Sequence, residues 1–216
     1  MMADFVMKVA LFHATTTVAG QPLPTGEEDN IYGFGGDDTI SGLGGNDFID
    51  GGAGDDVMRG GTGNDTYVVG SRKDVVIEES NNGIDTVQSS VSYSLSANVE
   101  NLTFTGTADV KGTGNDLDNA IVGNAGANVL AGMGGLDVLT GSGGSDRFVF
   151  NSTSDSNSSA SDVINDFVHG VDRIDLSAID ANVSIRNNQA FVPAPNLGCH
   201  RTNGDRHGAP VLGIRG

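Results

Sequence analysis

The stretch GGAGDDVMRGGTGNDTYVV, residues 51–69, contains the pattern Gly-Gly-x-Gly-x-Asp twice, nine residues apart, with an apolar residue two places after each aspartate. The same nine-residue frame extends in both directions. In a first block, residues 26–69, it holds Asp29, Asp38, Asp47, Asp56 and Asp65, followed by Ile31, Ile40, Ile49, Met58 and Tyr67. In a second block, residues 113–150, it holds Asn119, Asn128, Asp137 and Asp146, followed by Ile121, Leu130, Leu139 and Phe148. One register kept through nine units indicates a repeat architecture.

The two halves of each unit favour different backbone conformations. The glycine-rich half adopts positive φ without steric penalty and therefore turns tightly. The other half is a short strand, whose apolar residue points to one face while its neighbours point to the other. A single unit buries little, but stacked units bury a continuous ladder of apolar side chains. The sequence therefore predicts an all-β fold, a parallel β-solenoid built from two repeat blocks.

Two units make one coil, so frame residues eighteen apart stack on the same edge. Asp29, Asp47 and Asp65 are predicted on one edge, and Asp38 and Asp56 on the other. Carboxylates stacked one strand spacing apart, about 4.8 Å, repel each other unless a cation lies between them. Oxygen ligands without histidine or cysteine in the frame favour Ca²⁺. The predicted ligands of several calcium ions are the frame residues of both blocks and turn glycines, namely Gly33, Gly35, Gly42, Gly44, Gly51 and Gly60.

Composition excludes several classes of protein. The 216 residues carry a net charge of −17 with a pI of about 4.2, which argues against nucleic-acid binding because phosphates would be repelled. Acidic chains of modest hydrophobicity are often disordered unless something neutralises them, and bound cations would do so. Cys199 is the only cysteine, so no internal disulfide can form. No apolar run has the length of a membrane span, and we expect a monomer.

The nonapeptide resembles the calcium-binding repeat of the RTX (repeats-in-toxin) family. GGAGDDVMR and GGTGNDTYV match its pattern fully, and GFGGDDTIS, GLGGNDFID, GMGGLDVLT and GSGGSDRFV lack only the second glycine. GNDLDNAIV and GNAGANVLA have asparagine for aspartate, which predicts incomplete calcium occupancy there. The resemblance implies a parallel β-roll that folds on meeting external calcium. It also implies a secreted, extracellular bacterial protein, exported by a type I secretion apparatus without a cleaved N-terminal signal.

The remaining segments are predicted to extend or close the solenoid. Residues 1–25 form an N-terminal cap strand. A strand at 66–69 ends the first block, and residues 70–112 form an irregular β connector with strands at 74–79, 85–95 and 100–106. Residues 151–190 form a C-terminal β cap that resembles the region after the last repeats in serralysin-type metalloproteases. Within it, the polar residues 151–162 are expected to be a flexible surface loop.

Residues 191–216 differ from the rest of the chain. They contain three arginines and one aspartate, a balance of +2, and do not resemble an apolar-acidic secretion signal. The alternatives are an altered or frame-shifted end, a non-native tail, or a genuine special feature. We expect this tail to be disordered.

The sequence lacks the usual signatures of hydrolytic enzymes. It has no H-E-x-x-H and no G-x-S-x-G. The leading function is therefore a calcium-binding module that folds outside the cell and stabilises an exoprotein or assists its secretion. One alternative is a calcium-dependent hydrolase of esters or lactones, with His169, Asp166 and Asp172 as catalytic candidates. A second alternative is a cell-surface adhesion module.

Overall fold

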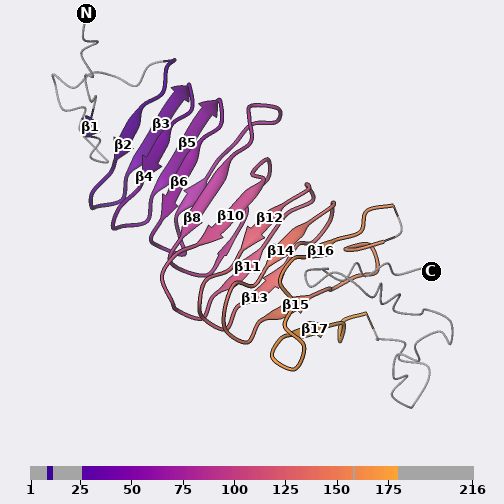
Figure 1. Ribbon diagram of the computed structural model, residues 1–216. Coiled ribbons are helices and arrows are strands. Elements are labelled where there is room, and N and C mark those ends of the chain that lie inside the picture. The colour runs from indigo at the N-terminus through magenta and orange to yellow at the C-terminus, as the bar shows by residue number, and fades with distance from the viewer. Residues whose placement is uncertain (1–8, 12–25, 158, 180–216) are drawn as a thin grey trace, which may run out of the picture.

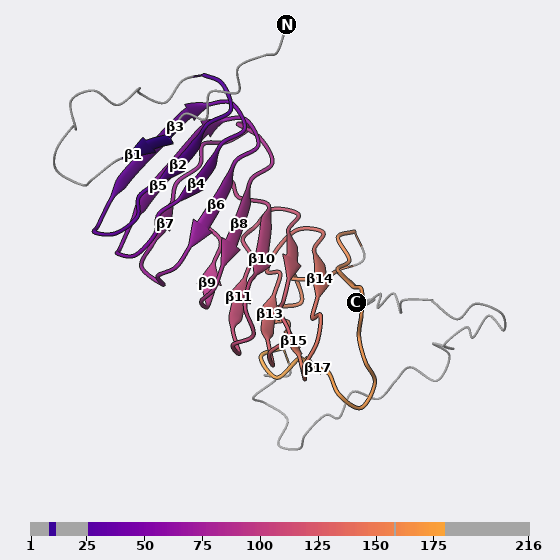
Figure 2. The ribbon, with the colours of Figure 1, turned by 60° about the vertical axis from the view of Figure 1, so that its left-hand side comes forward.

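The computed structural model describes residues 9–11, 26–157 and 159–179. Its strands follow one another along a single axis as an elongated solenoid, from the indigo to the orange end in Figure 1 and in the turned view of Figure 2. Every strand pair is parallel. The described ranges contain no helix, and hence none long and apolar enough to cross a membrane. The predicted all-β parallel solenoid is confirmed.

Three sheets form the two faces of the solenoid. The nine-stranded sheet has the order β1 (Val9–Leu11), β2 (Asn30–Tyr32), β4 (Phe48–Asp50), β6 (Thr66–Val69), β8 (Thr86–Ser89), β10 (Asn101–Phe104), β12 (Ala120–Val122), β14 (Val138–Thr140) and β16 (Val163–Ile164). The opposite face begins with β3 (Thr39–Gly44), β5 (Val57–Thr62) and β7 (Val75–Val76). It resumes with β9 (Tyr93–Ser94), β11 (Lys111–Thr113), β13 (Val129–Ala131), β15 (Arg147–Val149) and β17 (Arg173–Asp175).

The core is the ladder of apolar frame residues. Ile31 pairs with Ile49, and Ile40 pairs with Met58 on the other face, so partners lie eighteen residues apart as the frame predicts. All nine apolar frame residues are 0% exposed. Because burying one such side chain contributes about 1.5–3 kcal/mol, this ladder is the main apolar contribution to the stability of the fold.

The connector continues the solenoid with turns of other lengths. In the nine-stranded sheet Tyr67 pairs with Val87, Val87 with Leu102, and Leu102 with Ile121. These partners lie twenty, fifteen and nineteen residues apart, so the eighteen-residue coil is lost but the apolar ladder is kept. The second face is interrupted here, between β7 and β9.

The strand predicted over residues 85–95 is wrong as a single element. β8 ends at Ser89 and β9 begins at Tyr93, on the opposite face. The Ser89 hydroxyl donates a 2.8 Å hydrogen bond to the carbonyl of Val91 in the turn between them. The alternation of apolar and polar residues therefore runs through a corner, where a serine side chain stabilises the change of direction.

One place in the core ladder is filled from a neighbouring turn. Gly112 pairs with Tyr93 and Leu130, and therefore occupies a position in the ladder without contributing a side chain. A Cβ built on Gly112 would lie 2.7 Å from Cε2 of Phe104, whose side chain is only 4% exposed. The Phe104 ring thus takes the volume that an apolar residue at position 112 would otherwise fill.

We expect Phe104→Ala to lower the free energy of unfolding by about 3–5 kcal/mol, because no side chain at position 112 can close the cavity. Urea unfolding in saturating calcium measures this loss. Phe34→Ala is the matched control, since Phe34 is 56% exposed. Equal losses in the two variants would contradict the packing described here.

The C-terminal cap extends both faces. Leu139 pairs with Ile164 in β16, and Phe148 pairs with Ile174 in β17. Residues 151–162, between β15 and β16, are predicted to be a flexible surface loop. Two polar residues of this segment are nevertheless buried, since Asp155 is 7% and Ser156 is 5% exposed. The carboxylate of Asp155 accepts the backbone N–H of residue 151 at 2.7 Å, and the Ser156 hydroxyl accepts that of residue 162 at 3.0 Å. These polar side chains are buried because they satisfy backbone groups of their own turn.

At the N-terminal end β1 pairs in parallel with β2. β1 lies within residues 1–25, the segment predicted as a cap strand. The rest of residues 1–25, residues 180–190 of the predicted C-terminal cap and the predicted tail at 191–216 lie outside the described residues. The domain boundaries given above therefore remain predictions.

Candidate metal centre

The frame carboxylates form one row along each edge of the solenoid. On one edge the backbone N–H of Asp29 donates to Oδ1 of Asp47 at 2.8 Å, and that of Asp47 donates to Oδ1 of Asp65 at 2.7 Å. On the opposite edge the N–H of Asp38 donates to Oδ1 of Asp56 at 2.8 Å. The predicted stacking of aspartates eighteen residues apart is confirmed, and one oxygen of each accepting carboxylate is used to join two coils.

The second carboxylate oxygen lies in a notch beside the first glycine of the unit. A Cβ built on Gly42 would be 2.0 Å from Oδ2 of Asp47, and one built on Gly132 would be 2.0 Å from Oδ2 of Asp137. Any residue other than glycine would fill this space. Among the described residues, four of these buried Oδ2 atoms have no hydrogen-bond partner: those of Asp47, Asp56, Asp65 and Asp137.

Backbone carbonyls complete the notches. The Cβ positions of Gly33 and Gly42 would lie 2.3 Å and 2.8 Å from the carbonyl oxygens of Gly51 and Gly60 in the next coil. Carboxylate and carbonyl oxygens are the ligands that Ca²⁺ takes, whereas softer metals favour nitrogen or sulfur. A buried, unpaired carboxylate oxygen facing a carbonyl in a side-chain-free notch fits a calcium ion.

The remaining two glycine candidates, Gly35 and Gly44, lie in the same turns. A Cβ on Gly44 would be 2.6 Å from the Thr62 hydroxyl, and one on Gly35 would be 3.6 Å from the carbonyl of Ala53. Each is therefore close to the residue eighteen places later. The assignment of individual glycine carbonyls as calcium ligands stays a prediction.

Burial makes the charged form of these carboxylates unfavourable. Burial, aided by neighbouring carboxylates and opposed by a hydrogen bond from the backbone, raises the pKa of Asp47 to about 6 and that of Asp137 to about 7. Burial also raises the pKa of Asp56 and Asp65. The two ion pairs in the described part of the chain, Lys73–Asp55 and Arg147–Asp175, involve other carboxylates. A bound cation would supply the missing positive charge.

The two asparagines of the frame satisfy their surroundings without a cation. The Asn128 amide donates to the carbonyl of Gly126 at 2.8 Å, while its Oδ1 accepts the backbone N–H of Asn124 at 2.7 Å. Asn119 likewise donates to the carbonyls of Val99 and Glu100, both at 3.2 Å. An ionised aspartate cannot donate a hydrogen bond. In the two Asn units the side-chain amide therefore satisfies backbone carbonyls by hydrogen bonds, a role that a cation would have in the Asp units.

We therefore expect Asp47→Ala to weaken calcium binding more than Asn128→Ala. Asp47 has an acidic neighbour on either side in its row and an unpaired oxygen, whereas the Asn128 side chain is hydrogen-bonded through both its oxygen and its nitrogen. Calorimetric titration of the two variants measures the difference. Equal losses would show that the stacked carboxylates do not dominate binding.

The rows also contain acidic residues that the nonapeptide pattern did not identify. Asp74 accepts the N–H of Asp56 at 3.0 Å, and Asp162 accepts that of Asp137 at 3.1 Å. A signal was present in the sequence, because each of these acids precedes a buried apolar residue by two places. The additional row members are Asp74, Asp85, Glu100, Asp162 and Asp172.

The three catalytic candidates lie in or beside the last turn. The oxygens of Asp166 accept backbone N–H groups at 2.8 and 2.7 Å, and those of Asp172 do so at 2.9 and 2.7 Å. His169 is exposed, and no hydrogen bond between described residues joins it to either carboxylate. These contacts give Asp166 and Asp172 a role in holding the turn. The catalytic assignment stays a prediction that no contact here supports.

Two family models match the chain. The model of the RTX calcium-binding nonapeptide repeat, in four copies, matches residues 32–67. The model described as peptidase M10 serralysin C terminal matches residues 81–197, more than half of the chain. The chain belongs to the serralysin C-terminal family. No curated protein matches it. This RTX protein therefore has calcium-binding repeats on a β-roll, a combination that is typical of secreted bacterial proteins.

Proposed function

We propose that this chain is a calcium-triggered folding module of a bacterial exoprotein, which stabilises that protein outside the cell and assists its export. The observation that carries this proposal is the pair of carboxylate rows, in which four buried Oδ2 atoms lack a partner among the described residues, those of Asp47, Asp56, Asp65 and Asp137. A fold that buries unpaired carboxylates is unfavourable until cations bind. Ions that bind only the folded state then stabilise it by mass action.

The ligands we propose are the frame aspartates of both blocks together with the carbonyls of the turn glycines. Calcium supplies positive charge between successive coils. The chain's own residues do the rest: Oδ1 joins neighbouring coils through a backbone N–H, and Oδ2 faces the notch. The second block has Asn119 and Asn128 in two of its four frame places, so we expect its notches to bind fewer ions.

The calcium concentrations of the two compartments would make folding directional. Extracellular calcium modules bind in the range of about 10⁻⁴–10⁻³ M, far above the concentrations to which cytosolic sensors respond. A chain with this affinity stays unfolded inside the cell, where it can be threaded through an export channel. It folds on reaching external calcium, and folding disfavours its return.

Export of the full chain from bacteria with and without a type I apparatus tests the proposal. We expect the chain in the medium only when the apparatus is present, and β structure in the exported chain only when the medium contains calcium. Retention of the chain in cells that carry the apparatus would overturn the export role. Equal β structure with and without calcium would overturn the folding role, independently of export.

A further inference from the structure

A buried carboxylate that does not belong to the repeat frame lies where the first block meets the connector. Glu78 follows β7 and occupies the place, eighteen residues after Gly60, where a regular unit has its first glycine. The regular notch has no side chain at this place. Glu78 instead places a carboxylate in this space, and Glu78 is only 7% exposed.

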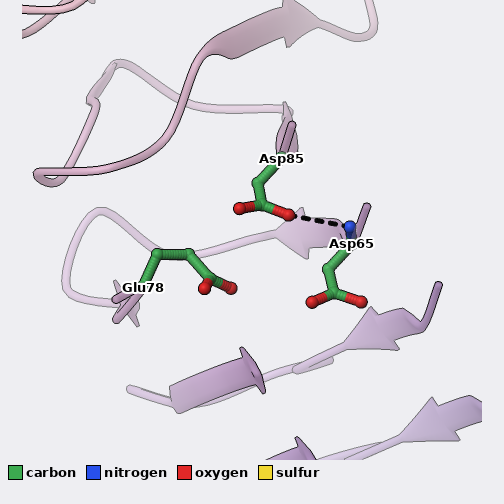
Figure 3. A group of neighbouring side chains, drawn as sticks. All are labelled: Asp65, Glu78 and Asp85. Carbon is green, nitrogen blue, oxygen red and sulfur yellow. Dashed lines mark hydrogen bonds between the residues drawn. The ribbon is translucent and has the colours of Figure 1, made fainter. Parts of the chain in front are cut away.

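Glu78 meets two members of the adjacent row. Carboxylate oxygens of Asp65, Glu78 and Asp85 all lie within 4.8 Å of one another, and Asp65 and Asp85 are each 1% exposed. Figure 3 shows the three carboxylates turned toward one another. The N–H of Asp65 donates to Oδ1 of Asp85 at 2.8 Å, which fixes these two residues relative to each other.

Two oxygens in this cluster are buried without a hydrogen-bond partner among the described residues: Oε2 of Glu78 and Oδ2 of Asp65. The other oxygen of Glu78 accepts a hydrogen bond from the Tyr67 hydroxyl, which in turn accepts the N–H of Gly60 at 2.6 Å. Tyr67 thus holds the Glu78 carboxylate by one oxygen and leaves the second directed into the cluster. Such an orphaned, more than nine-tenths buried acceptor points to a missing ligand.

We propose that Asp65, Glu78 and Asp85 bind a hard divalent cation of calcium's size, at a site that differs from the regular nonapeptide notches because the acidic side chain of Glu78 stands where a regular unit has its first glycine. Oxygens within 4.8 Å of one another can lie around one ion at the 2.3–2.6 Å distances of calcium. Mg²⁺ fits less well because it requires a near-ideal octahedron and retains waters. Neither ion pair between described residues involves these three acidic side chains, so they favour a cation over an anion or a neutral ligand.

This site goes beyond the proposed function because it joins the first repeat block to the connector, which the regular repeats do not do. Asp65 immediately precedes β6, Asp85 immediately precedes β8, and Glu78 lies two residues after β7 on the other face. The second face is interrupted after β7. A cation here would fasten the last regular coil to the first irregular one, at the point where only one sheet is continuous.

The number of calcium ions bound by the full chain tests the proposal. Native mass spectrometry is expected to show one ion fewer for Glu78→Gln than for the wild type, and no change for Glu79→Gln, the exposed neighbour. Glutamine keeps an oxygen for the Tyr67 hydroxyl, so this variant changes the charge more than the packing. An unchanged number of ions in folded Glu78→Gln would overturn the site. Loss of ions from Asp47→Asn but not from Glu78→Gln would leave the repeat sites standing without this one.

A second measurement needs no substitution and remains decisive if Glu78→Gln does not fold. Crystals of the wild-type protein soaked in Tb³⁺, which replaces calcium, are expected to show an anomalous-scattering peak between the three carboxylates. Peaks confined to the glycine notches would overturn the proposal, because the cluster would then be held by shared protons instead of a cation.

Discussion

Removing calcium is expected to abolish most of the β structure of this protein. Burial raises the pKa of four aspartates on the edges, and one oxygen of each lacks a hydrogen-bond partner among the described residues: Asp47, Asp56, Asp65 and Asp137. One site at a free calcium concentration a hundredfold above its Kd stabilises the fold by about 2.7 kcal/mol. Several such sites together reach the whole stability of a typical domain, about 5–15 kcal/mol.

Circular dichroism in excess chelator and in millimolar calcium measures this directly. We expect a largely disordered spectrum in chelator, recovery of β structure on adding calcium, and half-saturation on the order of 10⁻⁴–10⁻³ M. Magnesium at the same concentration is the control and should restore little structure. Identical spectra in chelator and in calcium would contradict a calcium-dependent fold.

Much of the fold follows from the regularity of the nonapeptide. In the first block each frame residue has the same neighbours one coil away. Counting eighteen residues along the sequence therefore predicts that Ile49 lies above Ile31 and Asp47 above Asp29. The frame restarts with the same spacing in the second block, where Ile121 pairs with Leu139. Repetition therefore converts a local pattern into long-range contacts.

The connector could not be derived in this way because its contacts depend on tertiary packing. No spacing in the sequence indicates that the Phe104 ring fills the place left by Gly112 in the next turn, or that residues 85–95 turn a corner at Ser89. The burial of Glu78 is a similar case. An acidic residue after a strand is ordinarily exposed, and only the stacked coils show that Glu78 faces Asp65 and Asp85.

The candidate site likewise has a part that the sequence predicts and a part that only the structure shows. The predicted aspartate rows follow from the frame, and the chemistry of their oxygens indicates calcium. The contacts of Asn119 and Asn128 required the structure, because the type of residue alone does not show that their amides donate to backbone carbonyls. The same holds for Asp172, whose hydrogen bond to the backbone of Asp146 extends a row.

Protons are expected to replace calcium in part, so the calcium-free protein should become more structured on acidification. The ordinary pKa of an aspartate is 3.8, whereas burial raises that of Asp47 to about 6 and that of Asp137 to about 7 in the folded chain. Between these values the folded state binds more protons than the unfolded state. The contribution of these groups to calcium-free stability is therefore fully present below about pH 4 and is lost as the pH rises through about 6–7.

The measurement is the amount of β structure, by circular dichroism, of the chelated protein at pH 7.5 and at about pH 5, which is still above the sequence pI of about 4.2. We expect more β structure at the lower pH, together with weaker calcium binding, because protons and calcium compete for the same oxygens. Asp137→Asn is the matched variant, since an amide at this place neither ionises nor binds calcium strongly. It should raise the calcium-free β structure at pH 7.5 and flatten its dependence on pH. If the chelated wild type instead has no more β structure at about pH 5, then the cost of burying these carboxylates is not what keeps the calcium-free chain unfolded.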